Sequence, residues 1–278
     1  MSGQAERAQR FRALHEGPGL LLIPNPWDAG SAKLLASLGF RALATTSGGA
    51  AATLGRLDGT MSRDEAIASA AAIVEATELP VSADLENGFA DDLAGVAETM
   101  RLALDAGLAG ASVEDYTRSE EKLYDIGVAS ERIAAAAEAA HNGPSQLVLT
   151  ARAENHLYGV TDLADTIARL QAYQEAGADV LYAPGLSQLE DIRQVVTSVD
   201  RPVNVLGRPG APSVAELDAV GVRRVSVGGA FAYAALGAVV EAARELLDEG
   251  TYGYFERAGI GLQAGRSAFA DDPEQARR

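Results

Sequence analysis

The sequence contains no cysteine, and its other scarcities also exclude whole classes of protein. Without cysteine there can be no disulfide, no thiolate metal site and no cysteine nucleophile. Aromatic residues make up only 5% of the 278 residues, so a core must be built from Ala, Leu, Val and Ile. No run of 18 uncharged apolar residues occurs, and the first 17 residues, MSGQAERAQRFRALHEG, lack an apolar signal region. These absences predict a cytoplasmic protein that does not enter a membrane.

Basic residues are also few. The chain has 23 Lys and Arg against 39 Asp and Glu, a formal net charge of −16. A field of this sign repels phosphate backbones and anionic lipid surfaces, so neither nucleic acid nor a membrane is expected as a partner. An anionic small substrate would need a local cation in order to bind.

Short apolar segments rich in β-formers alternate with helical patterns along the chain. Strand, helix and strand repeated in this way predict an α/β fold, and a count of eight favours a closed (β/α)₈ TIM barrel over an open doubly wound sheet. No linker interrupts the pattern, so residues 1–278 are predicted to form one domain. The eight predicted strands lie at 20–25, 41–47, 81–86, 110–115, 147–154, 179–185, 202–207 and 223–229.

The predicted helices have recognisable ends. Ser62, Ser187 and Ser213 are each followed three residues later by Glu, the capping-box pattern of a helix start. Three other helices are predicted to end at a glycine within 104–110, 174–180 and 217–224. Beyond the eighth helix, from about residue 249, a C-terminal extension carries Tyr252, Tyr254 and Phe255. These aromatic side chains are expected either to fold back onto the barrel or to form a subunit contact.

Polar residues recur where the predicted strands end, which is where catalytic residues of this fold lie. Asp84, Glu86 and Glu114 follow neighbouring strands and would repel one another if brought together. A divalent cation would relieve that repulsion, and an all-oxygen set of ligands suits Mg²⁺ or Mn²⁺. Alternatively, Asp84 and Glu86 pair with Arg152 or cap the next helix. The strand ends also present Asn25, Asp28, Thr46, Ser47, Asp115, Arg152, Glu154, Asn155, Tyr182 and Asn204.

Two further features could bind an anion. The segment 45–55, TTSGGAAATLG, reads as a Gly- and Ala-rich loop whose backbone N–H groups could hold a carboxylate. Arg152 could bind the same anion through two parallel hydrogen bonds. An ion pair between Arg152 and Glu154 is an equally good interpretation.

Six motifs in this order resemble the isocitrate lyase/phosphoenolpyruvate mutase superfamily, closest to its phosphonomutase-like bacterial branch. They are PNPWDAGSAKLLASLGF, TTSGGAAATLGRLDG, VSADLENG, SVED, LTARAEN and VLYAPG. The resemblance implies a (β/α)₈ barrel whose eighth helix is swapped between subunits of a homo-oligomer, a dimer or tetramer. It also implies Mg²⁺ bound directly by Asp84, with Asp58, Glu86 and Glu114 holding the waters of the metal.

The same resemblance implies a small-molecule substrate, a 2-oxo acid or an enolpyruvate derivative. Its carboxylate would meet Thr46, Ser47, Gly48 and Arg152, and Trp27, Asp28 and Asn204 are further candidates for substrate binding. The segment 116–128 departs from the family, because it lacks the cysteine of isocitrate and methylisocitrate lyases and the asparagine of the mutases. It carries Arg118 and Lys122 instead, and we expect it to act as a lid over the barrel.

These residues lead to three hypotheses. The first is a Mg²⁺-dependent lyase that cleaves a C–C bond of a 2-oxo or 2-hydroxy (di)carboxylic acid through an enolate, by retro-aldol cleavage or oxaloacetate-type decarboxylation. Its candidate catalytic residues are Asp58, Arg152, Lys122 and Arg118. The second is phosphoryl transfer of the phosphoenolpyruvate mutase kind, with Asp58 as nucleophile. The third is a non-catalytic protein that binds 2-oxo acids.

Overall fold

A computed structural model of the chain describes residues 3–117, 119–143 and 145–270. Its centre is one sheet of eight parallel strands, in the order β1-β10-β9-β8-β7-β4-β3-β2. The two end strands also meet, because the N–H of Ala44 donates to the carbonyl of Pro24 at 3.0 Å. The predicted (β/α)₈ barrel is therefore confirmed. Its strands are β1 Leu21–Ile23, β2 Leu43–Ala44, β3 Val81–Asp84, β4 Gly110–Glu114, β7 Val148–Arg152, β8 Val180–Tyr182, β9 Val203–Leu206 and β10 Arg224–Ser226.

A buried asparagine strengthens the closure of the barrel. The side-chain amide of Asn25, just after β1, donates to the carbonyl of Thr45 at 3.0 Å. Its oxygen accepts the N–H groups of Val227 and Gly228, both at 2.9 Å. One side chain thus joins the ends of β1, β2 and β10 at the mouth of the barrel.

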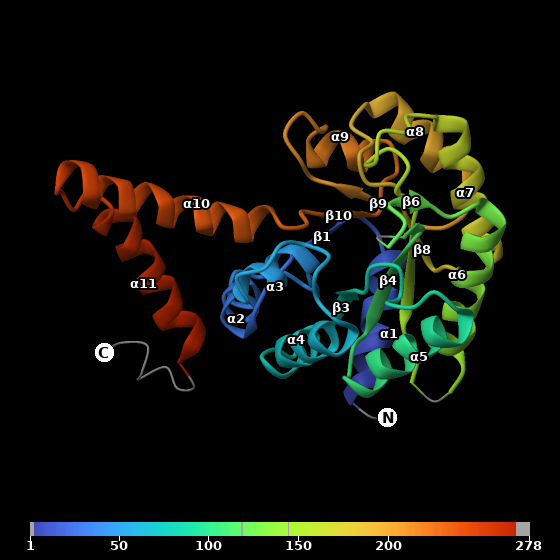
Figure 1. The fold of residues 1–278 in the computed structure, drawn as a ribbon, viewed down its shortest axis with the longest axis horizontal. Coiled ribbons are helices and arrows are strands. Elements are labelled where there is room, and N and C mark those ends of the chain that lie inside the picture. The colour runs from blue at the N-terminus through green and yellow to red at the C-terminus, as the bar shows by residue number, and fades with distance from the viewer. Residues whose placement is uncertain (1–2, 118, 144, 271–278) are drawn as a thin grey trace.

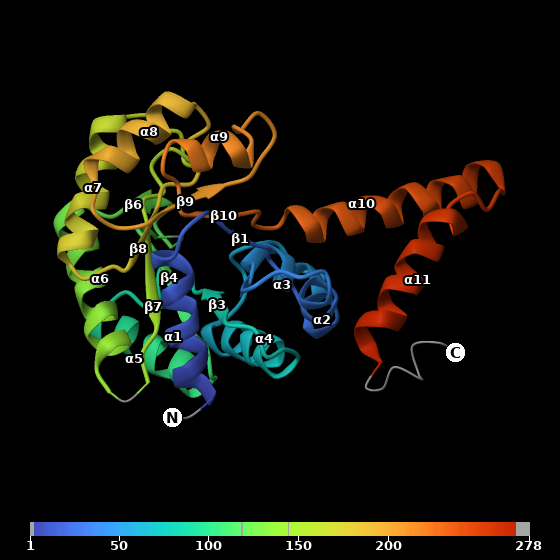
Figure 2. The same cartoon turned by 180° about the vertical axis from the view of Figure 1, so that it is seen from behind.

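The helices surround the strands (Figures 1 and 2). Gly107, Gly177 and Gly221 follow the last residues of three of them, with φ of +80°, +105° and +92°, so the predicted glycine ends are confirmed. This left-handed conformation is easy only for glycine. The helices around the barrel are α2 Ala29–Ser37, α3 Ser47–Thr53, α4 Arg63–Glu75, α5 Leu93–Asp105, α6 Ile126–His141, α7 Leu163–Glu175, α8 Leu189–Ser198 and α9 Val214–Ala219.

The predicted helix starts are right in two cases of three. Ser62 and Ser213 each form a complete capping box with the glutamate three residues on. The prediction for Ser187 is wrong, because α8 begins at Leu189 after Gln188, which makes no side-chain cap hydrogen bond. The predicted loop 45–55 is also wrong in part. Thr46 caps a short helix, α3, whose alanines favour helical structure.

An N-terminal helix, α1 (Gly3–Glu16), lies against the barrel strands (Figure 1). Phe11 is fully buried, and a Cβ added at Gly110 of β4 would lie only 2.7 Å from its ring. His15 is buried as well, and one of its ring nitrogens, Nδ1, lies 2.9 Å from the carbonyl of Phe11. The helix therefore contributes an apolar face and one buried histidine to the core.

His15 should make the protein lose stability in mild acid. Burial, together with the nearby charge of Arg224, lowers the pKa of His15 to about 3. In the unfolded chain, His15 has a pKa of about 6.5 and binds a proton below that pH, whereas the buried His15 of the folded chain stays neutral. The free energy of unfolding is therefore undiminished above about pH 6.5 and falls as the pH is lowered towards 3. From pH 7 to pH 5 the loss is about 2 kcal/mol. Urea unfolding at pH 7 and pH 5 measures this. Between the two pH values, the free energy of unfolding of His15→Gln should fall by about 2 kcal/mol less than that of wild type, and equal decreases would contradict the prediction.

The chain beyond the eighth strand leaves the barrel. Helix α10 (Ala230–Arg244) runs outward, continues as a π-helical turn at Glu245–Glu249, and α11 (Phe255–Phe269) returns to contact α2 (Figures 1 and 2). Tyr252, Tyr254 and Phe255 pack on one another at the turn, and Tyr252 is 64% exposed, so they do not fold back onto the barrel. Within the described residues no helix is long and apolar enough to cross a membrane.

The described parts of the segment 116–128 include regular secondary structure. Tyr116–Thr117 (β5) and Lys122–Leu123 (β6) form an antiparallel pair, and α6 begins at Ile126. The ring of Tyr116 stacks on that of Tyr158, with centroids 3.5 Å apart. Whether the segment closes over a ligand, as the lid hypothesis expects, stays a prediction.

Candidate active site

A polar cavity of about 180 Å³ opens at the C-terminal ends of the strands. This is smaller than the roughly 300–1,000 Å³ of sites for drug-sized ligands, so it suits a small metabolite. Residues from all eight barrel strands, or from the loops after them, line its wall. The lining includes Asn25, Thr46, Ser47, Gly48, Asp58, Ser82, Asp84, Ser112, Arg152, Tyr182, Arg224, Ser226 and Tyr233.

Arg152, the last residue of β7, is the centre of a cluster of carboxylates. Its Nη1 lies 2.8 Å from Asp84, its Nε lies 2.7 Å from Glu154, and its Nη2 lies 3.1 Å from Glu114. The ring of Tyr182 lies 5.5 Å from the guanidinium carbon. Arg152 therefore pairs with Glu154, as one sequence-based interpretation expects, and it also lines the cavity, where it could bind an anion.

The cluster is strongly coupled electrostatically. Burial disfavours the charged form of Arg152, but Glu154, Glu114 and Asp84 outweigh it and raise the pKa of Arg152 well above the ordinary value. Burial raises the pKa of Glu154, an effect that Arg152 partly offsets. Arg152 therefore remains a cation at any working pH.

Asp84 links this cluster to α3. Its Oδ2 accepts a hydrogen bond from the hydroxyl of Ser47 at 3.1 Å and a long one from the Ser47 N–H at 3.5 Å. The backbone of Glu86 has a φ of +47°, which is uncommon for a residue other than glycine. The predicted strand 81–86 thus ends at Asp84, and strand alternation does not place the buried side chain of Glu86.

The other predicted residues near α3 also lie at the cavity. Asp58 is exposed at its wall, and Thr46 is buried as the cap of α3. Gly48 leaves little room there, because a Cβ would lie 2.6 Å from the hydroxyl of Tyr233 and 3.3 Å from Asp58, so the Tyr233 side chain would have to shift. Tyr233, on α10, was not predicted, because nothing in the sequence places the start of the eighth helix over the barrel mouth.

Several predicted residues are not on the cavity wall. Trp27 and Asp28 line a separate hollow between α2, α3 and α4, and Asp28 caps α2 with a capping box. Lys122 is 61% exposed and pairs with Glu120. Asn204 lies just behind the wall, where it contacts Arg224 and Ser226. Arg118 lies outside the described residues.

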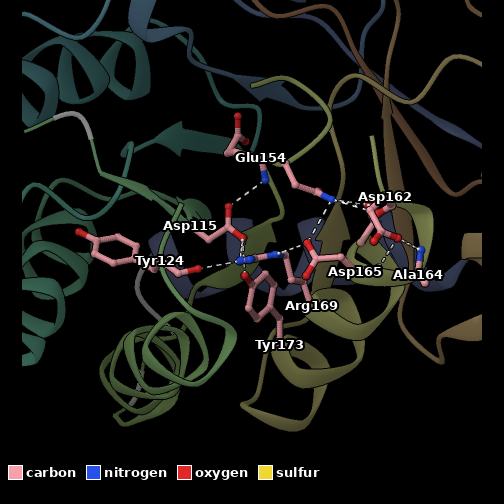
Figure 3. A network of polar contacts seen from close by, with 10 residues as sticks. Asp115, Tyr124, Glu154, Asp162, Ala164, Asp165, Arg169 and Tyr173 are labelled. Carbon is pink, nitrogen blue, oxygen red and sulfur yellow. Dashed lines mark hydrogen bonds and ion pairs between the residues drawn. The ribbon is translucent and has the colours of Figure 1, made fainter. Parts of the chain in front are cut away.

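A buried network fixes the backbone beside Arg152 (Figure 3). Asp115 accepts the N–H of Glu154 at 2.8 Å, the guanidinium of Arg169 at 2.9 Å and the hydroxyl of Tyr173 at 2.5 Å. Arg169 also donates to the carbonyl of Tyr124, which connects the segment after β6 to α7. Asp115 therefore holds the end of β7 in place and does not itself reach the cavity.

Arg224, like Tyr233, is a cavity residue that sequence reasoning missed. It is the first residue of β10, it is only 4% exposed, and it lines the cavity. The available signal was a charged residue inside the apolar strand segment RRVSVGG. A buried charge is costly unless it is compensated, so such a residue points to a role.

The donor atoms around Arg152 are of the kind that Mg²⁺ prefers. Among the described residues, no group of three or more His, Asp or Glu is arranged so that it could hold a metal, and Arg152 contacts both Asp84 and Glu114. The groups that meet there are nonetheless carboxylate and hydroxyl oxygens, which hard divalent cations prefer. The carboxylates of Asp84 and Glu114 together carry two negative charges, one more than the single positive charge of Arg152 offsets. A divalent cation is therefore compatible with this donor set.

The family model described as phosphoenolpyruvate phosphomutase matches residues 11–247, most of the chain. The chain belongs to the isocitrate lyase/phosphoenolpyruvate mutase superfamily. A superfamily structure, that of a candidate lyase/mutase from Burkholderia cenocepacia J2315, is 51% identical with a TM-score of 0.94, over 98% of this chain and 99% of that one.

Two relatives within the superfamily have named activities. The 2-methylisocitrate lyase of Halalkalibacterium halodurans is 31% identical over 72% of this chain and 67% of its own length. Oxaloacetate decarboxylase 2 of Pseudomonas fluorescens is 30% identical over 84% of this chain and 82% of its own. Superfamily members thus include enzymes that break C–C bonds in small carboxylic acids.

Proposed function

We propose that the protein is a Mg²⁺-dependent lyase that cleaves a C–C bond in a 2-oxo or 2-hydroxy dicarboxylic acid. The observation that carries the proposal is Arg152, a permanent cation at a small cavity, held among carboxylates that fit a divalent metal. Asp84 would bind the metal directly, with Asp58, Glu86 and Glu114 around its waters. When bound, Mg²⁺ would supply positive charge that stabilises the negative charge that develops on the substrate oxygen as the bond breaks.

The residues of the chain supply binding and orientation. A guanidinium has five N–H groups, and the three ion pairs of Arg152 run through three different nitrogens, so a second N–H on Nη1 or Nη2 could donate to a substrate carboxylate. The hydroxyl of Ser47 orients Asp84 from the opposite side. In a decarboxylation the electron pair stays on the carbon beside the oxo group and CO₂ departs, so no general base is needed. That reaction therefore suits a chain without cysteine.

Phosphoryl transfer of the mutase kind is the second candidate. It needs a nucleophile at the cavity, and the carboxylate of Asp58 lies on the cavity wall beside Gly48. The expected sign of this activity is conversion between phosphoenolpyruvate and a phosphonate.

The test compares substrates and metals directly. We expect oxaloacetate decay to accelerate with added Mg²⁺ or Mn²⁺ and to return to the uncatalysed rate with EDTA. A ³¹P spectrum of phosphoenolpyruvate under the same conditions should remain unchanged. Phosphonate signals would favour the mutase. Tight binding of 2-oxo acids with no turnover of oxaloacetate, malate or alkylated malates would favour the non-catalytic alternative.

We also propose that the protein is a homo-oligomer in which α10 packs on a second copy. The arm formed by α10 and α11 exposes apolar side chains such as Val239, which is 64% exposed, and Leu247, which is 83% exposed. A large exposed apolar surface is unusual for a monomer. Light scattering should show a dimer or tetramer for wild type and for Arg201→Glu, an exposed control, and a smaller species for the double variant Val239→Glu, Leu247→Glu. A monomeric wild type would refute this.

A further inference from the structure

Arg224 lies inside the barrel, among neutral partners. Its Nε donates to the side-chain oxygen of Asn204 at 3.0 Å, and its Nη1 donates to the hydroxyl of Thr150 at 3.1 Å. Among the described residues, no carboxylate lies within ion-pair distance of it. Arg152, by contrast, has three. The cavity thus contains one neutralised cation and one that has no counter-charge.

The guanidinium of Arg224 is nevertheless charged. Burial, together with the nearby charge of Arg152, lowers the pKa of Arg224 to about 10, which still leaves the group protonated at neutral pH. An uncompensated charge in a barrel interior is costly, and an anion that enters the cavity would offset that cost. The wall of the same cavity carries the hydroxyls of Ser82, Ser112 and Ser226, which can donate hydrogen bonds. Bulky branched residues fill this region in many barrels of this fold, so the polar lining is a specific feature.

The two arginines lie at different depths of one cavity. Arg224 donates a hydrogen bond to Thr150, which lies on β7 two residues before Arg152. Side chains two residues apart on a strand share a face, so Thr150 and Arg152 both face the interior and are separated by about 7 Å along the strand. Arg152 is the last residue of its strand and lies at the mouth of the barrel. Arg224 is the first residue of β10, and its partner Thr150 lies two residues deeper in the barrel than Arg152. A dicarboxylic acid carries negative charge at both ends and matches this arrangement.

We propose that Arg224 forms an anion subsite in the barrel interior that binds the distal carboxylate of the substrate, while the 2-oxo or 2-hydroxy acid end lies at Arg152. The inference rests on the proposed function for the nature of that acid end. It assigns Arg224 as a residue that determines specificity and selects dicarboxylates over monocarboxylates with the same 2-hydroxy acid group.

Malate and lactate test this directly, because both are 2-hydroxy acids and malate has the additional carboxylate. Titration calorimetry with Mg²⁺ present should show that wild type prefers malate. Arg224→Met should weaken malate binding about tenfold to hundredfold, the scale of a charged hydrogen bond, and change lactate binding less than about threefold. The neighbouring Arg223 is exposed, so Arg223→Met is the matched control and should behave as wild type.

The outcomes separate the subsite from the lyase proposal. Equal losses of malate and lactate affinity in Arg224→Met, unchanged malate affinity, or a wild type without preference for malate would each overturn the subsite. If Arg224→Met fails to fold, Arg224→Lys replaces it as the test variant, because lysine keeps the charge but loses the paired donors. The affinity of Arg224→Lys for malate must then fall while its affinity for lactate stays unchanged. A wild type that shows the Arg224-dependent preference but turns over no dicarboxylate would refute the lyase and leave the subsite intact.

Discussion

Replacing Asp84 with alanine is expected to lower metal-dependent turnover of a 2-oxo dicarboxylic acid about a thousandfold, since a metal contributes about 4 kcal/mol to such a transition state. Asp84 contacts Arg152 and Ser47 at the cavity wall, and it is the proposed direct ligand of the metal. Arg152 keeps Glu114 and Glu154 as partners in the variant, so the barrel should remain folded. Steady-state rates and Mg²⁺ titration by calorimetry measure the two effects.

Asp64→Ala is the control, because its side chain is 89% exposed on α4. It should leave turnover and Mg²⁺ affinity unchanged. If Asp84→Ala binds Mg²⁺ and a 2-oxo acid as tightly as wild type, Asp84 does not bind the metal, and the assignment of the metal residues fails.

Arg152→Lys is expected to weaken the binding of a 2-oxo acid by about 1–3 kcal/mol, the scale of a hydrogen bond to a charged group. The guanidinium contacts three carboxylates through three different nitrogens, whereas an ammonium is a single point charge that cannot span them. The variant should also melt at a lower temperature, because Glu154 is buried and loses its hydrogen bond from Nε. Calorimetry and thermal unfolding separate the two consequences.

The exposed Arg201 provides the control, and Arg201→Lys should change neither measurement. A lower melting temperature with unchanged ligand affinity would assign Arg152 to the support of the carboxylates alone. In that case the substrate carboxylate would have to bind elsewhere in the cavity.

Local patterns were sufficient to predict most of the fold. All eight strands lie within their predicted ranges, because each is a short apolar segment that follows a helix-ending glycine or a turn. Predicted boundaries were less accurate. Strand 81–86 stops at Asp84 because Glu86 adopts a left-handed backbone, and Ser187 does not cap α8 because the helix begins one residue later.

The site was predicted in part. Strand-end residues such as Asp84, Ser47 and Arg152 do meet at one cavity, because the C-terminal ends of parallel strands open at the same end of a barrel. The same reasoning could not show that Arg152 lies between Asp84 and Glu114. That position depends on the reach of a long side chain across neighbouring strands.

The sequence by itself determined the alternation of strands and helices, the family motifs, and the set of acids and arginine at the strand ends. These follow from residue spacing, because local periodicity decides which side chains share a face. Only the tertiary structure decided that Arg224 faces the cavity without a carboxylate, that Asn25 ties β1 to β2 and β10, and that α10 leaves the barrel. Each of these depends on contacts between segments as far apart as residues 25 and 228, which are set by closure of the barrel and not by local patterns.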